Sequence, residues 1–223
     1  MGERSEGVFV VLEGIDGSGT TTQAERWAAH LRAQRRLVHV TREPSGGPVG
    51  AQIRLVLTQR VAFPSEQQAE VMALLFAADR LDHVASEIAP HLRDGYVVVS
   101  DRYDLSSLAY QSITAGRDGG SPAIVAWIRE CNRFARRPDV TVVLDVSPSV
   151  AATRRRARGG AAELFDDADL QARLAAAYLR AEALVPDDRV IHIDGDRDPD
   201  AVSRSIVEAL DPFVSSPAAP RLG

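Results

Sequence analysis

Hydrophobic positions along the chain follow two alternating patterns. Five short runs are rich in valine, isoleucine and leucine and show little polar alternation, which is typical of strands buried on both faces. These runs lie at residues 8–13, 37–41, 96–100, 140–145 and 190–194. Between them are longer stretches with apolar residues at helical spacing, including residues 23–34, 66–92 and 170–184. Because parallel strands need crossover connections, the pattern predicts an α/β fold with a doubly wound, five-stranded parallel sheet flanked by helices.

The chain length and two loosely patterned segments suggest the domain organisation. With 223 residues, the chain is long enough for one domain, which we expect over residues 1–214. The stretch at about 154–168 is rich in arginine and glycine and is predicted to form a small lid. The proline-containing segment 215–223 is expected to be a flexible tail.

Composition argues against several classes of protein. The 26 basic and 31 acidic side chains leave a formal charge of -5, which is unlike a protein that coats nucleic acid. No apolar run reaches the roughly 18–20 residues of a membrane helix, and the first residues lack a signal-peptide pattern. The single cysteine, Cys131, excludes an internal disulfide framework and a multi-cysteine zinc site. We therefore expect a cytoplasmic protein that binds neither nucleic acid nor membranes.

A glycine-rich loop follows the first predicted strand. Its sequence, GIDGSGTTTQ at residues 14–23, lies between a strand and a helix, as a phosphate-binding loop requires. Glycines allow backbone N–H groups to converge on phosphate oxygens, and the N-terminus of the next helix adds partial positive charge. Thr21 stands where a hydroxyl would hold Mg²⁺. The residues expected to bind the phosphates of a nucleotide are Gly14, Gly17, Ser18, Gly19, Thr20, Thr21 and Thr22.

This loop departs from the usual phosphate-loop pattern at one position. Thr20 occupies the place of the lysine that normally reaches the β- and γ-phosphates. All 26 basic residues are arginines, so no lysine elsewhere can replace it. Three explanations are open from the sequence: an arginine from elsewhere supplies the charge, the protein binds nucleotide without efficient turnover, or the sequence carries a change at this position.

Charged residues also follow the second and third predicted strands. The second strand leads into Arg42 and Glu43, and the third leads into Asp101 and Arg102. The carboxyl ends of parallel strands form one edge of the sheet, where ligands bind in open α/β folds. Asp101 is suited to organise Mg²⁺, and Arg102 is suited to clamp a phosphate. A simple surface salt bridge is the alternative, but the position beside the phosphate loop favours ligand binding.

Phe76 and Arg80 are candidates for contact with a nucleobase. They are four residues apart on a predicted helix and therefore share one face, where a ring and a hydrogen-bond donor would suit a base. The pattern alone favours the alternative of a core phenylalanine and a solvated arginine.

Arginines cluster at the start of the predicted lid. Closure of a lid would bring such side chains onto transferring phosphates and exclude water. A solvated helix face is the alternative, since runs of charge usually face water. The cluster consists of Arg154, Arg155, Arg156 and Arg158.

Four motifs in combination resemble the thymidylate kinase family. They are VLEGIDG at 11–17, TREP at 41–44, LFAADR at 75–80 and SDRYDLSSLAYQ at 100–111. The resemblance extends from about residue 8 to about residue 211, nearly the whole chain. It implies a P-loop nucleoside monophosphate kinase that transfers the γ-phosphate of ATP to dTMP with Mg²⁺, usually as a homodimer.

The resemblance also implies roles for single residues. Phe76 would stack on thymine and Arg80 would address the base edge, while Ser107 and Tyr110 would flank the base and sugar. The implied dTMP-binding residues are Asp16, Arg42, Arg54, Phe76, Arg80, Arg102, Ser107 and Tyr110. Together with the patterns described above, this gives Asp16, Arg102 and the lid arginines Arg154 and Arg158 as the expected catalytic residues. The loop and strand-end patterns give Thr21 and Asp101 as the expected metal-binding residues.

The departures from the family pattern lie mainly on the donor-phosphate side. Besides Thr20, the lid reads ELFD at 163–166, where family members often have an acid, an arginine, an aromatic residue and a glutamate. The loop after Pro44 reads Ser-Gly-Gly where Gly-Gly-Thr is commoner. We therefore expect a dTMP kinase in which one or more lid arginines replace the missing charge. The alternatives are a weak or inactive nucleotide-binding homologue, and a kinase of another nucleoside monophosphate.

Overall fold

A computed structural model of the protein describes residues 7–63, 65–115, 120–159 and 167–215. Five parallel strands form one sheet in the order β2-β3-β1-β4-β5. The strands are β1 (Val8–Glu13), β2 (Val38–Arg42), β3 (Val97–Asp101), β4 (Val140–Asp145) and β5 (Val190–Asp194). The predicted α/β fold with a five-stranded parallel sheet is confirmed, and each strand lies within one residue of its predicted bounds.

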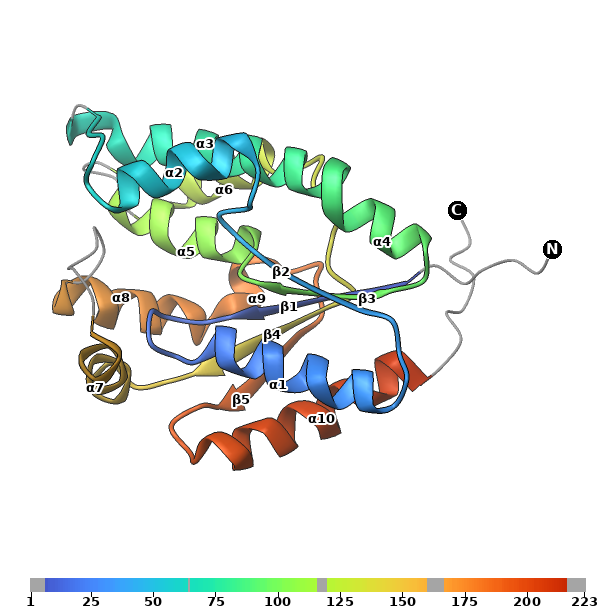
Figure 1. Ribbon diagram of the computed structural model, residues 1–223. Coiled ribbons are helices and arrows are strands. Elements are labelled where there is room, and N and C mark those ends of the chain that lie inside the picture. Colours follow the sequence, from blue (N-terminus) through green and yellow to red (C-terminus); the bar gives the residue numbers. More distant parts are fainter. Residues whose placement is uncertain (1–6, 64, 116–119, 160–166, 216–223) are drawn as a thin grey trace.

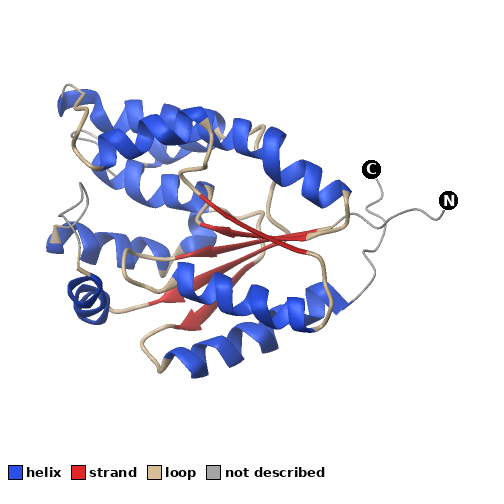
Figure 2. Ribbon diagram, viewed as in Figure 1, coloured by secondary structure: helices blue, strands red, loops and turns tan. Residues whose placement is uncertain are grey.

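Helices cover both faces of this sheet (Figures 1 and 2). Helices α1 and α10 pack together on one face, and α3 to α6 lie over the other, which α8 and α9 continue. The helices are α1 (Thr20–Ala33), α2 (Pro48–Leu57), α3 (Gln68–His83), α4 (Ala89–Arg93), α5 (Asp104–Thr114), α6 (Pro122–Cys131), α7 (Pro148–Arg158), α8 (Ala168–Tyr178), α9 (Ala181–Leu184) and α10 (Pro199–Ser215).

Burial of each strand follows its place in the sheet. The three inner strands are almost completely buried, whereas the edge strands β2 and β5 are mostly half-buried. Side chains alternate between the two faces, so Phe9 and Val11 of β1 pack in the cluster beside α4, while Val10 and Leu12 pack in the larger cluster that contains Trp27 of α1. The continuous apolar runs in the sequence thus correspond to strands covered on both sides.

The predicted helix at 66–92 is divided into several segments. A short 3₁₀ turn, η1 (Ser65–Gln67), precedes α3, and a π-helical turn, η2 (Val84–Ile88), separates α3 from α4. Pro90 lies just after this turn and has no N–H to donate to the carbonyl of Ser86, which breaks the regular hydrogen-bond series. The predicted helix at 170–184 is likewise divided, into α8 and α9.

The predicted lid and tail lie partly outside the described residues. Helix α7 ends at Arg158, inside the predicted lid, and α8 begins at Ala168, but residues 160–166 with the ELFD sequence are not described. Residues 216–223 of the predicted tail are not described either. The lid, the tail and the single domain over 1–214 therefore stay predictions. In the described part of the chain, none of the helices has the length and apolar character needed to cross a membrane.

Candidate active site

The phosphate loop connects β1 to α1 at the carboxyl edge of the sheet, where the strand arrows end in Figure 1. Gly17 has φ of 90° and Gly19 has φ of 96°, a left-handed backbone conformation that favours glycine. Gly19 is the N-cap of α1, so the unpaired N–H groups of the first turn of α1 follow it directly. The loop therefore presents backbone donors and a helix N-terminus in one place, as anion binding requires.

A cavity of about 700 Å³ opens beside this loop. We call it the donor cavity. The phosphate-loop residues from Asp16 to Gln23 line it, as do residues from the ends of β2 and β3, from α7 and from the segment after β5. Of the predicted phosphate-binding residues, Gly17, Ser18, Gly19, Thr20, Thr21 and Thr22 line the cavity, whereas Gly14 lies behind the loop, next to Ser18 and the Leu144 carbonyl.

Thr21 and Asp101, the two predicted metal-binding residues, contact each other in the donor cavity. The Thr21 hydroxyl donates a hydrogen bond to Oδ2 of Asp101. The Asp101 side chain is buried, and its Oδ1 has no hydrogen-bond partner among the described residues. A hydroxyl beside a carboxylate with a free oxygen matches the oxygen ligands that Mg²⁺ prefers. The residues present thus fit the ion that the sequence implied.

Two arginines of α7 reach the phosphate loop. Arg154 donates to the carbonyls of Ser18 at 3.2 Å and Gly195 at 2.9 Å, and Arg155 donates to the carbonyl of Asp16 at 2.5 Å. Both side chains line the donor cavity. Arg156 is exposed and donates to Thr153 on its own helix.

The α7 arginines differ from the catalytic set expected from sequence. Arg154 belongs to that set and lines the donor cavity, whereas Arg158 is the last residue of α7 and its side chain is outside the described part of the structure. Arg155 was only one of four candidates in an arginine run. Helical periodicity places Arg155 and Arg156 on different faces, but the run itself carries no signal of which face meets the loop.

A second cavity, of about 150 Å³, lies next to the first. We call it the acceptor cavity. Residues from the phosphate loop, the loop after β2, α2, α3, the connection between β3 and α5, and α5 line it: Asp16, Glu43, Pro44, Leu57, Phe76, Arg102, Tyr103, Ser106, Ser107, Tyr110 and Gln111. Five of the eight predicted dTMP-binding residues are in this set. Asp16 and Arg102 line both cavities and therefore lie at their boundary.

Arg102 is held from several sides at this boundary. Its Nη2 donates to Asp16 at 2.6 Å, its Nη1 donates to Ser106 at 3.1 Å, and its guanidinium lies 5.3 Å from the centre of the Tyr110 ring. Burial raises the pKa of Tyr110 above its ordinary value, so this side chain stays a neutral hydroxyl at physiological pH. The alternative of a salt bridge between Asp101 and Arg102 is not seen among the described contacts, because Asp101 contacts Thr21 and Arg102 pairs with Asp16.

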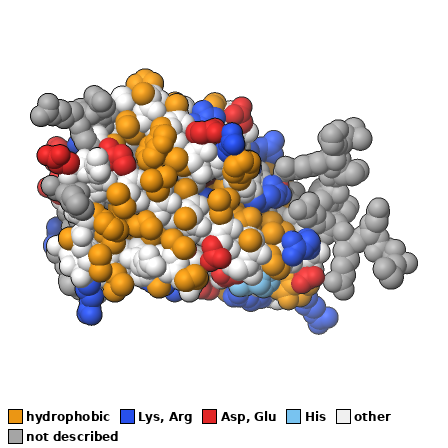
Figure 3. Space-filling view, turned by 90° about the horizontal axis from the view of Figure 1, so that it is seen from above, with side chains coloured by type: hydrophobic (Ala, Val, Ile, Leu, Met, Phe, Trp, Pro, Cys, Tyr) orange, Lys and Arg blue, Asp and Glu red, His pale blue; other side chains and the backbone are white. Residues whose placement is uncertain are grey.

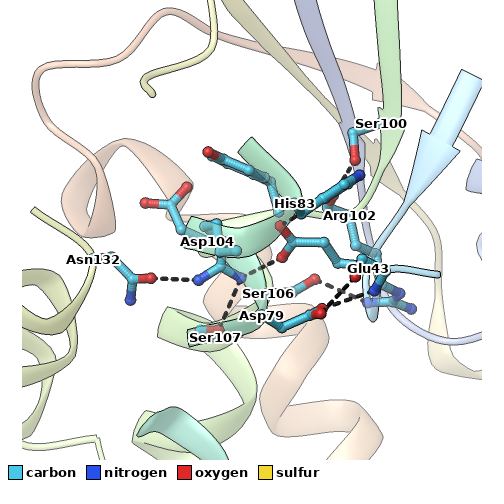
Figure 4. A network of polar contacts seen from close by, with 12 residues as sticks. Glu43, Asp79, His83, Ser100, Arg102, Asp104, Ser106, Ser107 and Asn132 are labelled. Atoms are coloured by element: carbon cyan, nitrogen blue, oxygen red, sulfur yellow. Dashed lines mark hydrogen bonds and ion pairs between the residues drawn. The ribbon is translucent and has the colours of Figure 1, made fainter. Parts of the chain in front are cut away.

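Arg80 is completely buried and lies behind the wall of the acceptor cavity. Its Nη2 contacts Glu43 at 2.5 Å and Ser107 at 3.3 Å, and its Nη1 donates to Asn132. Figure 4 labels Glu43, Ser107 and Asn132, whose dashed lines meet at one side chain between them, which the hydrogen bonds identify as Arg80. Sequence reasoning did not find the roles of Glu43 and Asn132, because both depend on segments that are distant along the chain.

Asp79, the neighbour of Arg80 in α3, holds the loop after β2. Its two carboxylate oxygens accept hydrogen bonds from the backbone N–H of Ser45 at 2.7 Å and from the Ser45 hydroxyl at 2.6 Å. Ser45, the serine of the Ser-Gly-Gly sequence, therefore anchors this loop to α3.

Arg42 and Arg54 do not line the acceptor cavity. Arg42, at the end of β2, lines the donor cavity. Arg54 of α2 donates to the carbonyls of Ser45 at 2.5 Å and Pro44 at 3.2 Å, and lines neither cavity. The structure thus brings Asp16, Phe76, Arg102, Ser107 and Tyr110 together, and places Arg42, Arg54 and Arg80 around them.

Known proteins resemble this chain along most of its length. Residues 12–206 match the family model for thymidylate kinase. The chain is 42% identical over 206 residues to the thymidylate kinase of Bifidobacterium longum, a match that covers 90% of this chain and 95% of that protein. It is 39% identical over 202 residues to a probable thymidylate kinase of Pyrobaculum aerophilum, covering 91% and 95%. A probable thymidylate kinase of Pyrococcus horikoshii is 39% identical over 187 residues, covering 83% and 88%.

Proposed function

This chain belongs to the thymidylate kinase family and is an ATP-dependent kinase of dTMP, and from that premise we propose how its two cavities divide the reaction. The phosphates of ATP occupy the donor cavity, and dTMP occupies the acceptor cavity. The observation that carries this proposal is that Asp16 and Arg102 line both cavities. A phosphoryl group passing from one to the other would cross the point where these two side chains meet.

On the acceptor side, we propose that Phe76 stacks on the base and that Ser107 and Tyr110 flank the base and sugar. Arg80 would act on the base edge through Ser107, whose hydroxyl it contacts at 3.3 Å. Arg102 would bind the acceptor phosphate, with Asp16 holding its guanidinium at 2.6 Å. Arg42 would approach the same phosphate from the donor side, and Arg54 would support the loop that carries Pro44 and Ser45.

On the donor side, we propose that Arg154 and Arg155 supply the charge that Thr20 lacks. Phosphoryl transfer needs little covalent chemistry from the protein, so positioning and charge stabilisation are the main tasks. Both residues line the donor cavity, and their guanidinium groups contact carbonyls of the phosphate loop. Arg158 stays a prediction from sequence.

We propose that Thr21 and Asp101 hold Mg²⁺ together with the phosphates of ATP. The support is the contact between the two side chains and the unpartnered Oδ1 of Asp101 among the described residues. A bound Mg²⁺ ion would neutralise charge on the transferring phosphoryl group.

We also propose that the protein is cytoplasmic and forms a homodimer. Hydrophobic side chains gather on the face formed by α2, α3 and α6, which Figure 3 shows from above. On α3, Leu74 and Leu81 are 52% and 39% exposed and are seven residues apart, hence on one side of the helix. Contiguous exposed apolar surface of this kind is typical of protein interfaces. We propose that a second copy of the chain covers it.

The test of the proposed function is ADP formation from ATP and Mg²⁺ with dTMP as acceptor. We expect robust turnover by the wild type. Arg155→Ala should lower kcat by about 10²–10³-fold, as loss of a group that stabilises transition-state charge does, with little change in the KM for dTMP. Arg156→Ala is the matched control, because Arg156 is on the same helix but exposed, and it should keep wild-type turnover.

Different outcomes of this assay test different parts of the proposed function. Absence of wild-type turnover would contradict the kinase activity, and recovery in Thr20→Lys would then assign the defect to the missing lysine. Wild-type turnover that persists in both Arg154→Ala and Arg155→Ala would show that neither arginine replaces the lysine charge.

A further inference from the structure

Glu13, the last residue of β1, is completely buried and accepts four hydrogen bonds. Its Oε1 accepts from the backbone N–H groups of Tyr103 at 2.8 Å and Ser106 at 3.1 Å. Its Oε2 accepts from the Ser106 hydroxyl at 2.6 Å and the Tyr178 hydroxyl at 3.1 Å. Glu13 lines neither the donor nor the acceptor cavity. Burial of a carboxyl group costs free energy, so the presence of Glu13 beside the site calls for an explanation.

The two backbone contacts cap the N-terminus of α5. Tyr103 is the N-cap residue of α5 and its side chain makes no capping hydrogen bond. Glu13 supplies this cap from the neighbouring strand, because its Oε1 accepts from both N–H groups. Arg102 immediately precedes the N-cap and has φ of 74°, a left-handed conformation that is strained for arginine. The bond from the Tyr103 N–H to Glu13 helps to keep the chain in this conformation.

The hydroxyl of Ser106 links Glu13 to the Arg102 side chain. The Ser106 hydroxyl donates to Oε2 of Glu13 at 2.6 Å, so its single hydrogen points toward Glu13. The lone pairs of the Ser106 oxygen are then free to accept from Nη1 of Arg102 at 3.1 Å. The Tyr178 hydroxyl lies 3.0 Å from the Ser106 hydroxyl and 3.5 Å from Nη1 of Arg102. It therefore contacts both side chains of this link.

We infer that Glu13 is a positioning residue that fixes the Arg102 guanidinium at the boundary between the two cavities. It acts on the backbone of Arg102 through Tyr103 and on the side chain through Ser106. The inference rests on the proposed role of Arg102 at the acceptor phosphate. Glu13 touches neither nucleotide in this arrangement, so its effect on dTMP depends on Arg102.

The test compares Glu13→Gln, Arg102→Met and the double variant in the full chain. Calorimetry measures the affinity for dTMP and, separately, for a non-hydrolysable ATP analogue with Mg²⁺. We expect Glu13→Gln to weaken dTMP binding by about tenfold, because the amide places a donor NH₂ group where one accepting oxygen of Glu13 was and so breaks part of the network. The affinity for the ATP analogue should change less than about twofold. In the Arg102→Met background, Glu13→Gln should have little further effect, since the two changes remove the same interaction.

Asp104→Asn is the matched control for damage to α5. Asp104 is also a buried carboxylate in the first turn of this helix, but it pairs with Arg137. It should lower thermal stability and leave dTMP affinity unchanged. If Glu13→Gln does not fold, Ser106→Ala takes its place, because it breaks the link between Glu13 and the Arg102 side chain and leaves the backbone cap.

Two outcomes would overturn the inference. One is wild-type dTMP affinity in Glu13→Gln while Arg102→Met binds weakly. The other is an equal loss of affinity from Glu13→Gln with and without Arg102. If Arg102→Met itself binds dTMP as the wild type does, the proposed role of Arg102 fails instead, and the inference about Glu13 fails with it.

Discussion

Glu13 and Glu43 are both buried carboxylates at the active site, but they are compensated in different ways. Glu43 lies 2.5 Å from the guanidinium of Arg80 and 3.5 Å from the ring of His83. Glu13 is compensated by hydrogen bonds, and no ion pair of Glu13 is found within the described residues. Burial raises the pKa of Glu13 from its ordinary value of 4.5 to about 7, although Arg102 and the hydrogen bonds from Ser106 and Tyr103 oppose the shift.

This raised pKa predicts a specific pH dependence of stability. Because the folded pKa of about 7 exceeds the ordinary value of 4.5, the folded state binds a proton on Glu13 where the unfolded state does not. The resulting stabilisation is fully present below about pH 4.5 and is lost as the pH rises through about 7. Between these limits, the free energy of unfolding of the wild type should fall by about 3 kcal/mol relative to that of Glu13→Gln.

Urea unfolding of both proteins across this pH range provides the measurement. Other titrating groups contribute equally to the two curves, so the difference isolates Glu13. Curves that stay parallel from pH 4.5 to pH 7.5 would contradict the predicted shift.

At the scale of elements, the phosphate loop and α7 are packed closely enough to exclude a side chain. A Cβ atom added to Gly17 would lie 2.5 Å from the carbonyl oxygen of Ala151 in α7 and 3.0 Å from Cγ of Arg155. A Cβ atom on Gly19 would meet no atom within 4 Å. The two glycines share a left-handed backbone but differ in their surroundings. The close approach at Gly17 is what brings the α7 arginines onto the loop.

This difference predicts unequal effects of the two alanine substitutions. Gly19→Ala should lower the free energy of unfolding by about 1–2 kcal/mol, the cost of a left-handed conformation for a residue with a Cβ atom. Gly17→Ala should cost about 1–3 kcal/mol more, because the added methyl group also forces α7 away. Chemical denaturation of the two variants checks the prediction. Equal losses would contradict the close packing of the loop against α7.

At the scale of the whole molecule, we predict that a charge on the proposed interface disrupts the dimer. Replacing Leu74 with glutamate places a charge on the exposed apolar face of α3. Because a second copy meets the same face in a symmetric dimer, each dimer would bury two uncompensated charges. Sedimentation or light scattering should then show the wild type as a dimer and Leu74→Glu mainly as a monomer.

Leu179→Glu is the control for this experiment. Leu179 is 60% exposed, but it follows α8, on a different side of the molecule from the α3 face (Figure 1). This variant should stay dimeric. A monomeric wild type, or a Leu74→Glu variant that dimerises as the wild type does, would contradict an interface on α3.

Local patterns in the sequence were sufficient to predict the sheet and the phosphate loop. Each strand is a short, continuous apolar run, because inner parallel strands are buried on both faces whatever their neighbours are. The phosphate loop is contiguous in the sequence. Its glycines, its hydroxyl groups and the missing lysine can therefore all be recognised within ten consecutive residues. The same holds for the pairing of Phe76 and Arg80 on one helix, because the helical repeat is local.

Only the tertiary structure decided which charges meet. Arg80 and Phe76 share a helix, yet Phe76 lines the acceptor cavity while Arg80 is buried against Glu43 and Asn132, which come from other segments. The choice of Arg154 and Arg155 over Arg156 depends on which side of α7 packs on Gly17. Glu13 gains its role only because the carboxyl end of β1 lies beside that of β3. These contacts join residues far apart along the chain, and short-range periodicity contains no information about them.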